Sequence, residues 1–234
     1  LKKRPLNNPI ICHFYNIKKI EENFEINSLD YDLANIFWPG PLTLVLPRRP
    51  HSNISRLASA GLNTVALRAP GHPTARQLLK LASCPVAAPS ANLSGNLSPT
   101  TPHHVSKSLG DNVQLILDGG PCSIGIESTI IDCSVTPPCL LRPGGVPVEE
   151  IEKEIGPLAV PSESTVRAPG MLANHCRNNN YNVQILDCEV MGLSFKKSAE
   201  EILANEIIMA ARNDANCFSI KKKFEQERMA MSAR

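Results

Sequence analysis

Short apolar runs that begin or end at proline or glycine recur through the first 150 residues, and they constrain the fold more than any other feature. Runs of this length between turn residues are typical of β-strands. We expect strands within seven stretches, namely 9–14, 42–47, 64–70, 84–89, 113–120, 128–134 and 139–145. The sequence contains no apolar run of about 18 residues, so it predicts no membrane span.

Segments with helix start signals separate some of these runs. Pro73 opens one segment, Thr101 can cap a second that Gly110 ends, and Pro147 opens a third that closes at Gly156. Strands interspersed with helices in an order that does not strictly alternate predict an α/β fold with a mixed sheet.

Charge and cysteine content say little about function. A formal net charge of +2 is too small to indicate nucleic-acid binding by itself. The eight cysteines include no C-x-x-C pair, so free thiols in a reducing compartment are the simplest interpretation. The N-terminus also lacks the apolar stretch of a secretory signal. We therefore expect a cytoplasmic protein without a metal site.

Polar side chains stand where the apolar runs begin or end. They are Lys2, Arg4, His13, Thr64, Arg68, Ser90, Asn92, Ser128, Thr129 and Arg142. Such positions gather at one edge of an open α/β sheet, where these sheets bind ligands. Arginine and lysine with hydroxyl groups between them suit a polyphosphate better than a neutral ligand. For any one arginine, a salt bridge that caps a strand is an equal alternative, so the residues alone predict an anion-binding α/β domain and no more.

Common catalytic motifs are missing from the sequence, including G-x-S-x-G, H-E-x-x-H and G-x-G-x-x-G after a strand. Gly120 and Gly125 have the separation of a phosphate-binding loop. However, Ile126 and Glu127 stand where that loop requires lysine and serine or threonine. This excludes a standard P-loop.

Seven motifs, in order, resemble those of the YrdC-like L-threonylcarbamoyladenylate synthases. The first is KKRPLNNPIICH from Lys2, and it is followed by FWPGPLTLVL, VALRAPGHP, APSANLSG, ILDGG, ESTIID and LLRPGGV. The resemblance covers about residues 2–150. It implies a twisted mixed sheet around a concave basic cavity. It also implies an enzyme that joins L-threonine, bicarbonate or CO2, and ATP, with Mg²⁺, into threonylcarbamoyl-AMP and pyrophosphate. A separate transferase complex would then modify tRNA.

The same resemblance assigns roles to individual residues. Lys2 and Arg4 would be the catalytic residues that hold phosphates. The ATP-binding residues would be Arg4, Asn8, Thr64, Ser90, Asn92, Ser98 and Arg142. The threonine-binding residues would be His13, Arg68, Ala88 and Ser128, with the small Ala88 leaving room for the amino acid.

The resemblance also divides the chain, into a catalytic domain (1–155), a linker (156–180) and a small, partial or divergent C-terminal α/β domain (181–234). The stretch APGMLANHC (168–176) resembles the linker of the long family branch, which folds back over the active site, although Cys176 stands where tyrosine is usual. A P-T-x-T-x-Y-G-L segment precedes the K-x-R motif in the family but is missing from this sequence. We therefore expect a version extended at the N-terminus to be more stable, and residues 1–234 to have little or no synthase activity.

Two other functions remain open at this point. The cationic concavity could instead hold double-stranded RNA by its phosphates, as a non-catalytic module, or tRNA directly. Alternatively, the chain could be an inactive fragment or paralogue that folds without doing chemistry. Omitting ATP, threonine and bicarbonate in turn from a pyrophosphate-release assay discriminates among these functions.

Overall fold

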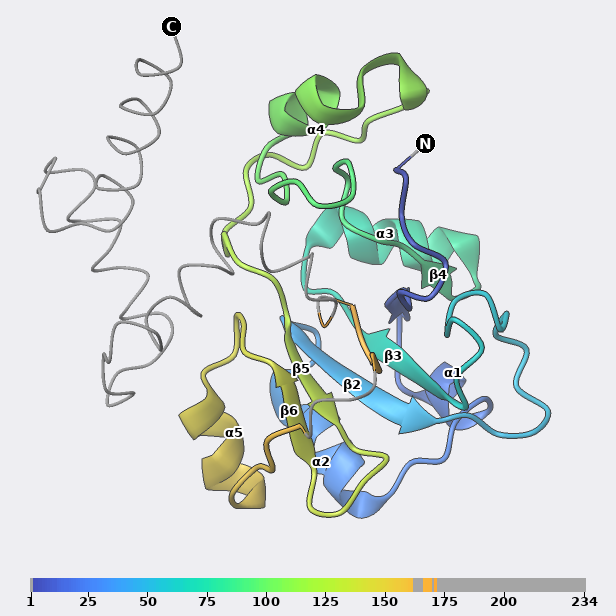
Figure 1. The fold of residues 1–234 in the computed structure, drawn as a ribbon, viewed down its shortest axis with the longest axis vertical. Helices are drawn as coiled ribbons and strands as arrows, with labels where there is room; N and C mark the ends of the chain where they lie inside the picture. Colours follow the sequence, from blue (N-terminus) through green and yellow to red (C-terminus); the bar gives the residue numbers. More distant parts are fainter. Residues whose placement is uncertain (1, 162–165, 170, 172–234) are drawn as a thin grey trace, which may run out of the picture. The chain divides into compact units, whose positions relative to one another are not determined.

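The computed structural model describes residues 2–161, 166–169 and 171, and a six-stranded mixed sheet forms its centre (Figure 1). Two strand pairs are parallel, β1 with β3 and β2 with β5, whereas the other three are antiparallel. The order across the sheet is β4-β1-β3-β2-β5-β6. The strands are β1 (Cys12–His13), β2 (Leu42–Pro47), β3 (Thr64–Arg68), β4 (Val86–Ala87), β5 (Thr129–Asp132) and β6 (Cys139–Arg142). This sheet confirms the expected α/β class.

The helices begin and end largely where the sequence signals stand. They are α1 (Lys18–Glu21), α2 (Ser28–Phe37), α3 (Pro73–Ala82), α4 (Pro102–Leu109) with the 3-10 turn Gly110–Asn112, and α5 (Val148–Ile155). As predicted, Thr101 caps α4, its Oγ1 accepting a hydrogen bond from the His104 amide at 3.3 Å. Helices α1 and α2 were not predicted, although Asn27 and Asp30 form a reciprocal capping box at the start of α2.

Neighbouring residues of a strand point to opposite faces of a sheet. Ile130 and Ile131 on β5 are both fully buried, so both faces of the sheet are covered there. On β5, Ile131 joins the larger core cluster with Phe14, Leu33 and Ile151, which attaches α2 and α5 to the sheet. Ile130 joins a smaller cluster with Ile11, Val45, Ala66 and Ala168. The second face is therefore covered partly by the segment around Ala168, far along the chain.

One predicted strand is wrong. Residues 113–120 form no strand, and the side chains of Leu115 and Leu117 are 74% and 55% exposed. A strand persists only when a neighbour pairs with its backbone groups, and within the described part of the chain no strand pairs with this stretch. The runs at 9–14 and 84–89 do reach the sheet, but each contributes only two residues to it.

Among the described residues, every helix is too short or too polar to cross a lipid bilayer.

Candidate functional site

Lys2 is attached to the loop that follows β4. Its Nζ donates hydrogen bonds to the carbonyl of Ser90 and, at 3.3 Å, to Asn92 Oδ1. Its own carbonyl accepts a hydrogen bond from the amide of Ser94 at 2.9 Å. Burial, followed by the charge of Arg4, lowers the pKa of Lys2 to about 8. Three residues predicted to bind ATP or its phosphates, Lys2, Ser90 and Asn92, therefore lie together.

Arg4 folds back onto the turn that leads into β1. Its Nε donates to the carbonyl of Asn8 at 3.3 Å and its Nη2 donates to the carbonyl of Pro9. Burial lowers the pKa of Arg4, and the charge of Glu127 opposes this shift. The side chain of Asn8 is buried, and its Oδ1 has no hydrogen-bond partner in the described part of the chain. A buried acceptor without a donor is costly, so Asn8 Oδ1 suits a ligand that brings one.

His13 and Arg68 are register partners on the parallel strands β1 and β3. Burial, and then the charge of Arg68, lowers the pKa of His13 to about 4, so the imidazole is neutral at pH 7. His13 Nδ1 lies 3.3 Å from the carbonyl of Val86, and when Nδ1 carries the proton, Nε2 is an acceptor. Arg68 Nε donates to the carbonyl of Gly40 at 2.9 Å, which fixes the plane of its guanidinium.

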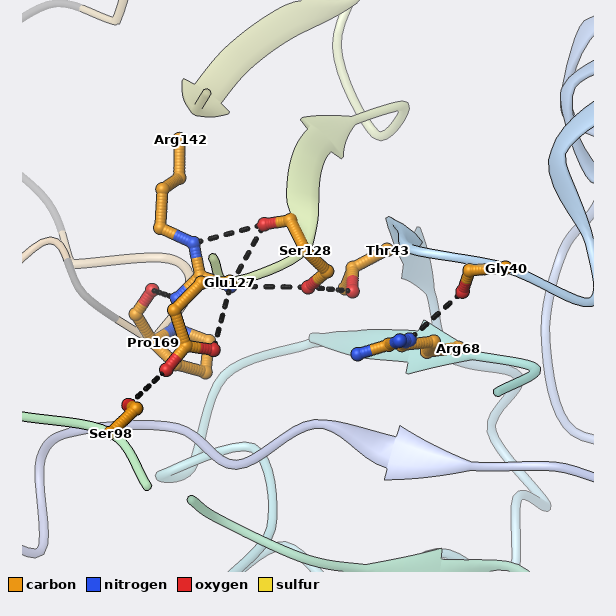
Figure 2. Close-up of polar contacts among 8 residues, drawn as sticks. All are labelled: Gly40, Thr43, Arg68, Ser98, Glu127, Ser128, Arg142 and Pro169. Atoms are coloured by element: carbon orange, nitrogen blue, oxygen red, sulfur yellow. Dashed lines mark hydrogen bonds and ion pairs between the residues drawn. The ribbon is translucent and has the colours of Figure 1, made fainter. Parts of the chain in front are cut away.

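Ser128 and Arg142 lie side by side at the start of β5 and the end of β6 (Figure 2). Arg142 Nη2 donates to the carbonyl of Ser128 at 2.9 Å and to its Oγ at 3.1 Å, while Nε donates to the same carbonyl at 3.1 Å. Ser128 Oγ also lies 2.8 Å from Thr43 Oγ1 on β2. Both Ser128 and Arg142 are buried. The predicted threonine and ATP sites therefore adjoin at these two residues.

Glu127 pairs with one of the cationic side chains and acts on three others through its charge. Ser98 Oγ donates to Glu127 Oε1 at 2.5 Å, and Arg142 Nη2 lies 3.6 Å from Glu127 Oε2 (Figure 2). The charge of Glu127 also raises the pKa values of Lys2, Arg4 and Arg68 against the effect of burial. Four cationic side chains from distant parts of the sequence, Lys2, Arg4, Arg68 and Arg142, therefore lie within the electrostatic influence of this carboxylate.

Two of the predicted site residues, Thr64 and Ala88, lie outside the set of contacts around Glu127. Thr64 begins β3 and Arg68 ends it, so the two are about 13 Å apart along the strand at ~3.3 Å per residue. Ala88 follows β4, and its amide donates to the carbonyl of Ile11 at 3.1 Å, which places it beside β1.

The described part of the linker reaches the site. Pro169 accepts a hydrogen bond from Arg142 Nη1 at 3.3 Å. Ala168 is fully buried in the smaller core cluster, and Arg167 Nη1 lies 2.8 Å from Asp132 Oδ2. Nearer the start of the linker, the amide of Ala159 donates to the carbonyl of Pro138 at 2.9 Å. Cys176 and the expected C-terminal domain (181–234) lie outside the described residues.

Sequence reasoning missed Glu127, Thr43 and Pro169 as parts of the site. The one signal for Glu127 was its place directly before Ser128, between a run of small residues and a strand. Thr43 gives no local signal, because it lies within the apolar run of β2 and meets Ser128 only through the pairing of β2 with β5.

Two further observations bear on where ligands could bind. A cavity of about 450 Å³ lies beside β1 and β4, and its lining, which includes Cys12, Cys84 and Ala87, contains none of the predicted site residues. Within residues 2–161, 166–169 and 171, no group of three or more His, Cys, Asp or Glu side chains is placed to hold a metal ion. The cationic side chains around Glu127 do not line this cavity, and they define the candidate anion-binding site.

Known proteins are similar to the part of the chain that contains this candidate site. The family model Sua5_yciO_yrdC, described as telomere recombination, matches residues 1–144. A protein of Pyrococcus abyssi named threonylcarbamoyl-AMP synthase is 46% identical over 181 residues, which are 74% of this chain and 53% of the relative. A protein of Bacillus subtilis with the same name is 46% identical over 160 residues, 68% of this chain and 46% of the relative. The chain thus spans about half the length of the curated relatives it matches.

A solved structure also resembles this chain. The crystal structure of P. abyssi Sua5 complexed with L-threonine superposes with a TM-score of 0.69 at 47% identity, covering 73% of this chain and 52% of that one.

A second family model, ribosomal protein S7p/S5e, matches residues 175–234. The expectation of a divergent synthase domain at 181–234 stays a prediction.

Proposed function

Because the chain belongs to the Sua5/YciO/YrdC family, we propose that it carries the catalytic domain of a threonylcarbamoyl-AMP synthase. The substrates would be L-threonine, bicarbonate or CO2, and ATP, with Mg²⁺ entering as part of the nucleotide substrate. The names of the relatives and the threonine complex of P. abyssi Sua5 support this choice. The product would serve a transferase complex that modifies tRNA, in the cytoplasm.

One observation carries the proposal: the charge of a single carboxylate, that of Glu127, acts on four cationic side chains. Desolvated cations in excess of their counter-charge favour an anionic ligand. ATP and the carboxylate of an amino acid both supply negative charge. An adjoining pair of hydroxyl groups, on Thr43 and Ser128, supplies neutral hydrogen bonds.

The threonine end of the site would consist of Arg68, His13 and Ser128. Since Gly40 holds Arg68 Nε, the Nη groups, which have no partner among the described residues, suit a two-point contact with the substrate carboxylate. The neutral His13 can accept a hydrogen bond from the threonine hydroxyl at Nε2. Ser128 Oγ and the space above Ala88 would complete the pocket.

The nucleotide end would consist of Lys2, Arg4 and Arg142 for the phosphates, with amide and hydroxyl groups for the nucleoside. The unpartnered Asn8 Oδ1 suits an N–H or O–H donor on the ligand. The remaining contacts in this proposal are Thr64, Ser90, Asn92 and Ser98.

The chemistry requires little acid or base from the protein. The amino nitrogen of threonine forms a bond to the carbon of CO2 and loses a proton, which gives a carbamate. A carbamate oxygen then bonds to the α-phosphorus of ATP as the bond to pyrophosphate breaks. Lys2 and Arg4 would stabilise the charge on the phosphates, and binding of both substrates side by side would supply the orientation.

Calorimetry and a pyrophosphate-release assay test the proposal. We expect the folded chain to bind ATP and L-threonine. We expect release of pyrophosphate to require ATP, threonine and bicarbonate together. A folded chain that binds neither ATP nor threonine would contradict the proposal. Salt-dependent binding of double-stranded RNA without pyrophosphate release would favour the RNA-binding module instead.

A further inference from the structure

We propose that Glu127 sets the affinity of the site for polyphosphate, because its carboxylate occupies the nucleotide-binding groups when no nucleotide is bound. This inference rests on the proposed function, since it takes Ser98 and Arg142 to be contacts of ATP. It assigns to Glu127 a role that differs from that of every cation around it.

The Glu127 carboxylate contacts two side chains that we propose to bind ATP. Its Oε1 accepts a hydrogen bond from Ser98 Oγ at 2.5 Å, and its Oε2 lies 3.6 Å from Arg142 Nη2 (Figure 2). A phosphate oxygen would need the same hydroxyl hydrogen and the same guanidinium edge. The carboxylate and a phosphate therefore compete for these groups.

The negative charge of Glu127 also acts on cationic side chains beyond these two contacts. Glu127 acts on Lys2, Arg4 and Arg68 in addition to its ion pair with Arg142. A single negative charge that all four cations share lowers the positive potential that a polyphosphate meets. The charge of Glu127 therefore weakens the binding of a polyphosphate whether or not the polyphosphate touches Glu127.

The side chain can leave without a change in the backbone. The side chain of Glu127 is 29% exposed, compared with 9% for Arg142. Its carbonyl, by contrast, is held by the amide of Gly145 at 2.9 Å. A Cβ atom at Gly144 would lie only 2.4 Å from the Glu127 carbonyl oxygen, so the absence of a side chain at Gly144 lets its backbone pack closely against this residue. Rotation of side-chain torsions alone would therefore release the Ser98 hydroxyl and remove the ion pair with Arg142, while Arg142 would keep its hydrogen bonds to Ser128 and Pro169.

A charge-removing substitution tests the inference. Glu127→Gln keeps the size of the side chain and its acceptor for Ser98 but removes the negative charge. We expect inorganic triphosphate to bind the variant about tenfold more tightly than the wild-type chain in calorimetry at low salt, with the difference shrinking as salt screens the charges. Glu127→Asp retains the charge and should stay nearer to the wild type. Glu150→Gln, on an exposed turn of α5, removes the same charge elsewhere and should change little.

Three results would overturn the inference. Equal or weaker triphosphate binding by Glu127→Gln, with binding intact in the wild type, would contradict it while leaving the proposed function in place. Absence of polyphosphate binding by both proteins would remove the proposed function as well. A structure of the wild-type chain with bound triphosphate supplies a measurement that does not depend on the variant folding. We expect Ser98 Oγ to contact the ligand there, and a retained bond from Ser98 to Glu127 would overturn the inference.

Discussion

Asp132, fully buried at the end of β5, pairs at 2.8 Å with Arg167, which lies 35 residues later in the chain. Asp132 Oδ1 also accepts hydrogen bonds from the amide and hydroxyl of Ser134 at 2.9 and 2.5 Å. The ion pair therefore ties the linker to the sheet beside the fully buried Ala168.

Removal of Arg167 should destabilise the fold. Arg167→Ala leaves the buried carboxylate of Asp132 without its cation, and such a loss costs about 1–3 kcal/mol when other hydrogen bonds remain. Urea denaturation should show a lower midpoint for this variant. Arg56→Ala, at an exposed position, is the matched control. Identical midpoints for Arg167→Ala and the wild type would show that the pair contributes nothing to stability.

ATP affinity should fall as the pH rises through about 8. Burial and Arg4 lower the pKa of Lys2 to about 8, so Lys2 loses its charge across this range and a phosphate loses a cationic partner. Lys2→Gln should bind ATP more weakly at pH 7 and show a flatter pH dependence. The adjacent, exposed Lys3 gives the control Lys3→Gln. Calorimetry between pH 6.5 and 9.5 would contradict the prediction if the wild-type and Lys2→Gln profiles had the same slope.

Arg142 should contribute strongly to nucleotide binding. Arg142→Ala removes a charge-assisted contact worth about 1.5–3 kcal/mol, which weakens ATP binding roughly 10- to 100-fold. Arg142→Lys keeps the charge but loses the paired bonds to Ser128, so we expect an intermediate affinity. Circular dichroism must first show that each variant is folded. Unchanged ATP affinity in folded Arg142→Ala would end the assignment.

Threonine should bind better than serine or valine. A pocket that bonds a hydroxyl through His13 or Ser128 and packs a methyl group disfavours an amino acid that lacks either. Ser128→Ala should reduce the preference for threonine over valine, because the variant loses a hydroxyl partner. Calorimetric titration of the chain with each of the three amino acids measures this preference. Serine or valine binding as tightly as threonine would contradict the assignment.

Much of the fold could be predicted from local signals, since strands and helices begin and end at proline, glycine and capping residues. Helix α4 shows this, as Thr101 and Gly110 bound it in both the sequence and the structure. Residues 113–120 have the same apolar pattern as the true strands but no strand beside them, and pairing is a property of the whole sheet. Local sequence cannot report a missing neighbour.

The sequence could indicate only some of the residues that the structure brings together, for a related reason. The lysine and arginine residues could be recognised as candidates by their residue type and by their place at strand ends. Glu127 meets Ser98 and Arg142 across 29 and 15 positions of sequence, and His13 faces Arg68 through the register of two parallel strands. Such encounters depend on topology, which short motifs do not encode.

At Gly144 the packing of the neighbouring backbone leaves no room for a side chain. A Cβ atom there would fall 2.5 Å from both the Ser128 carbonyl carbon and the Thr129 amide nitrogen. These are backbone atoms, so no rotamer change could relieve the overlap. In a library of random variants, even alanine at position 144 would therefore score like the loss of a substrate contact. Mutational tolerance alone therefore cannot distinguish a glycine that is required for packing from one that contacts a substrate.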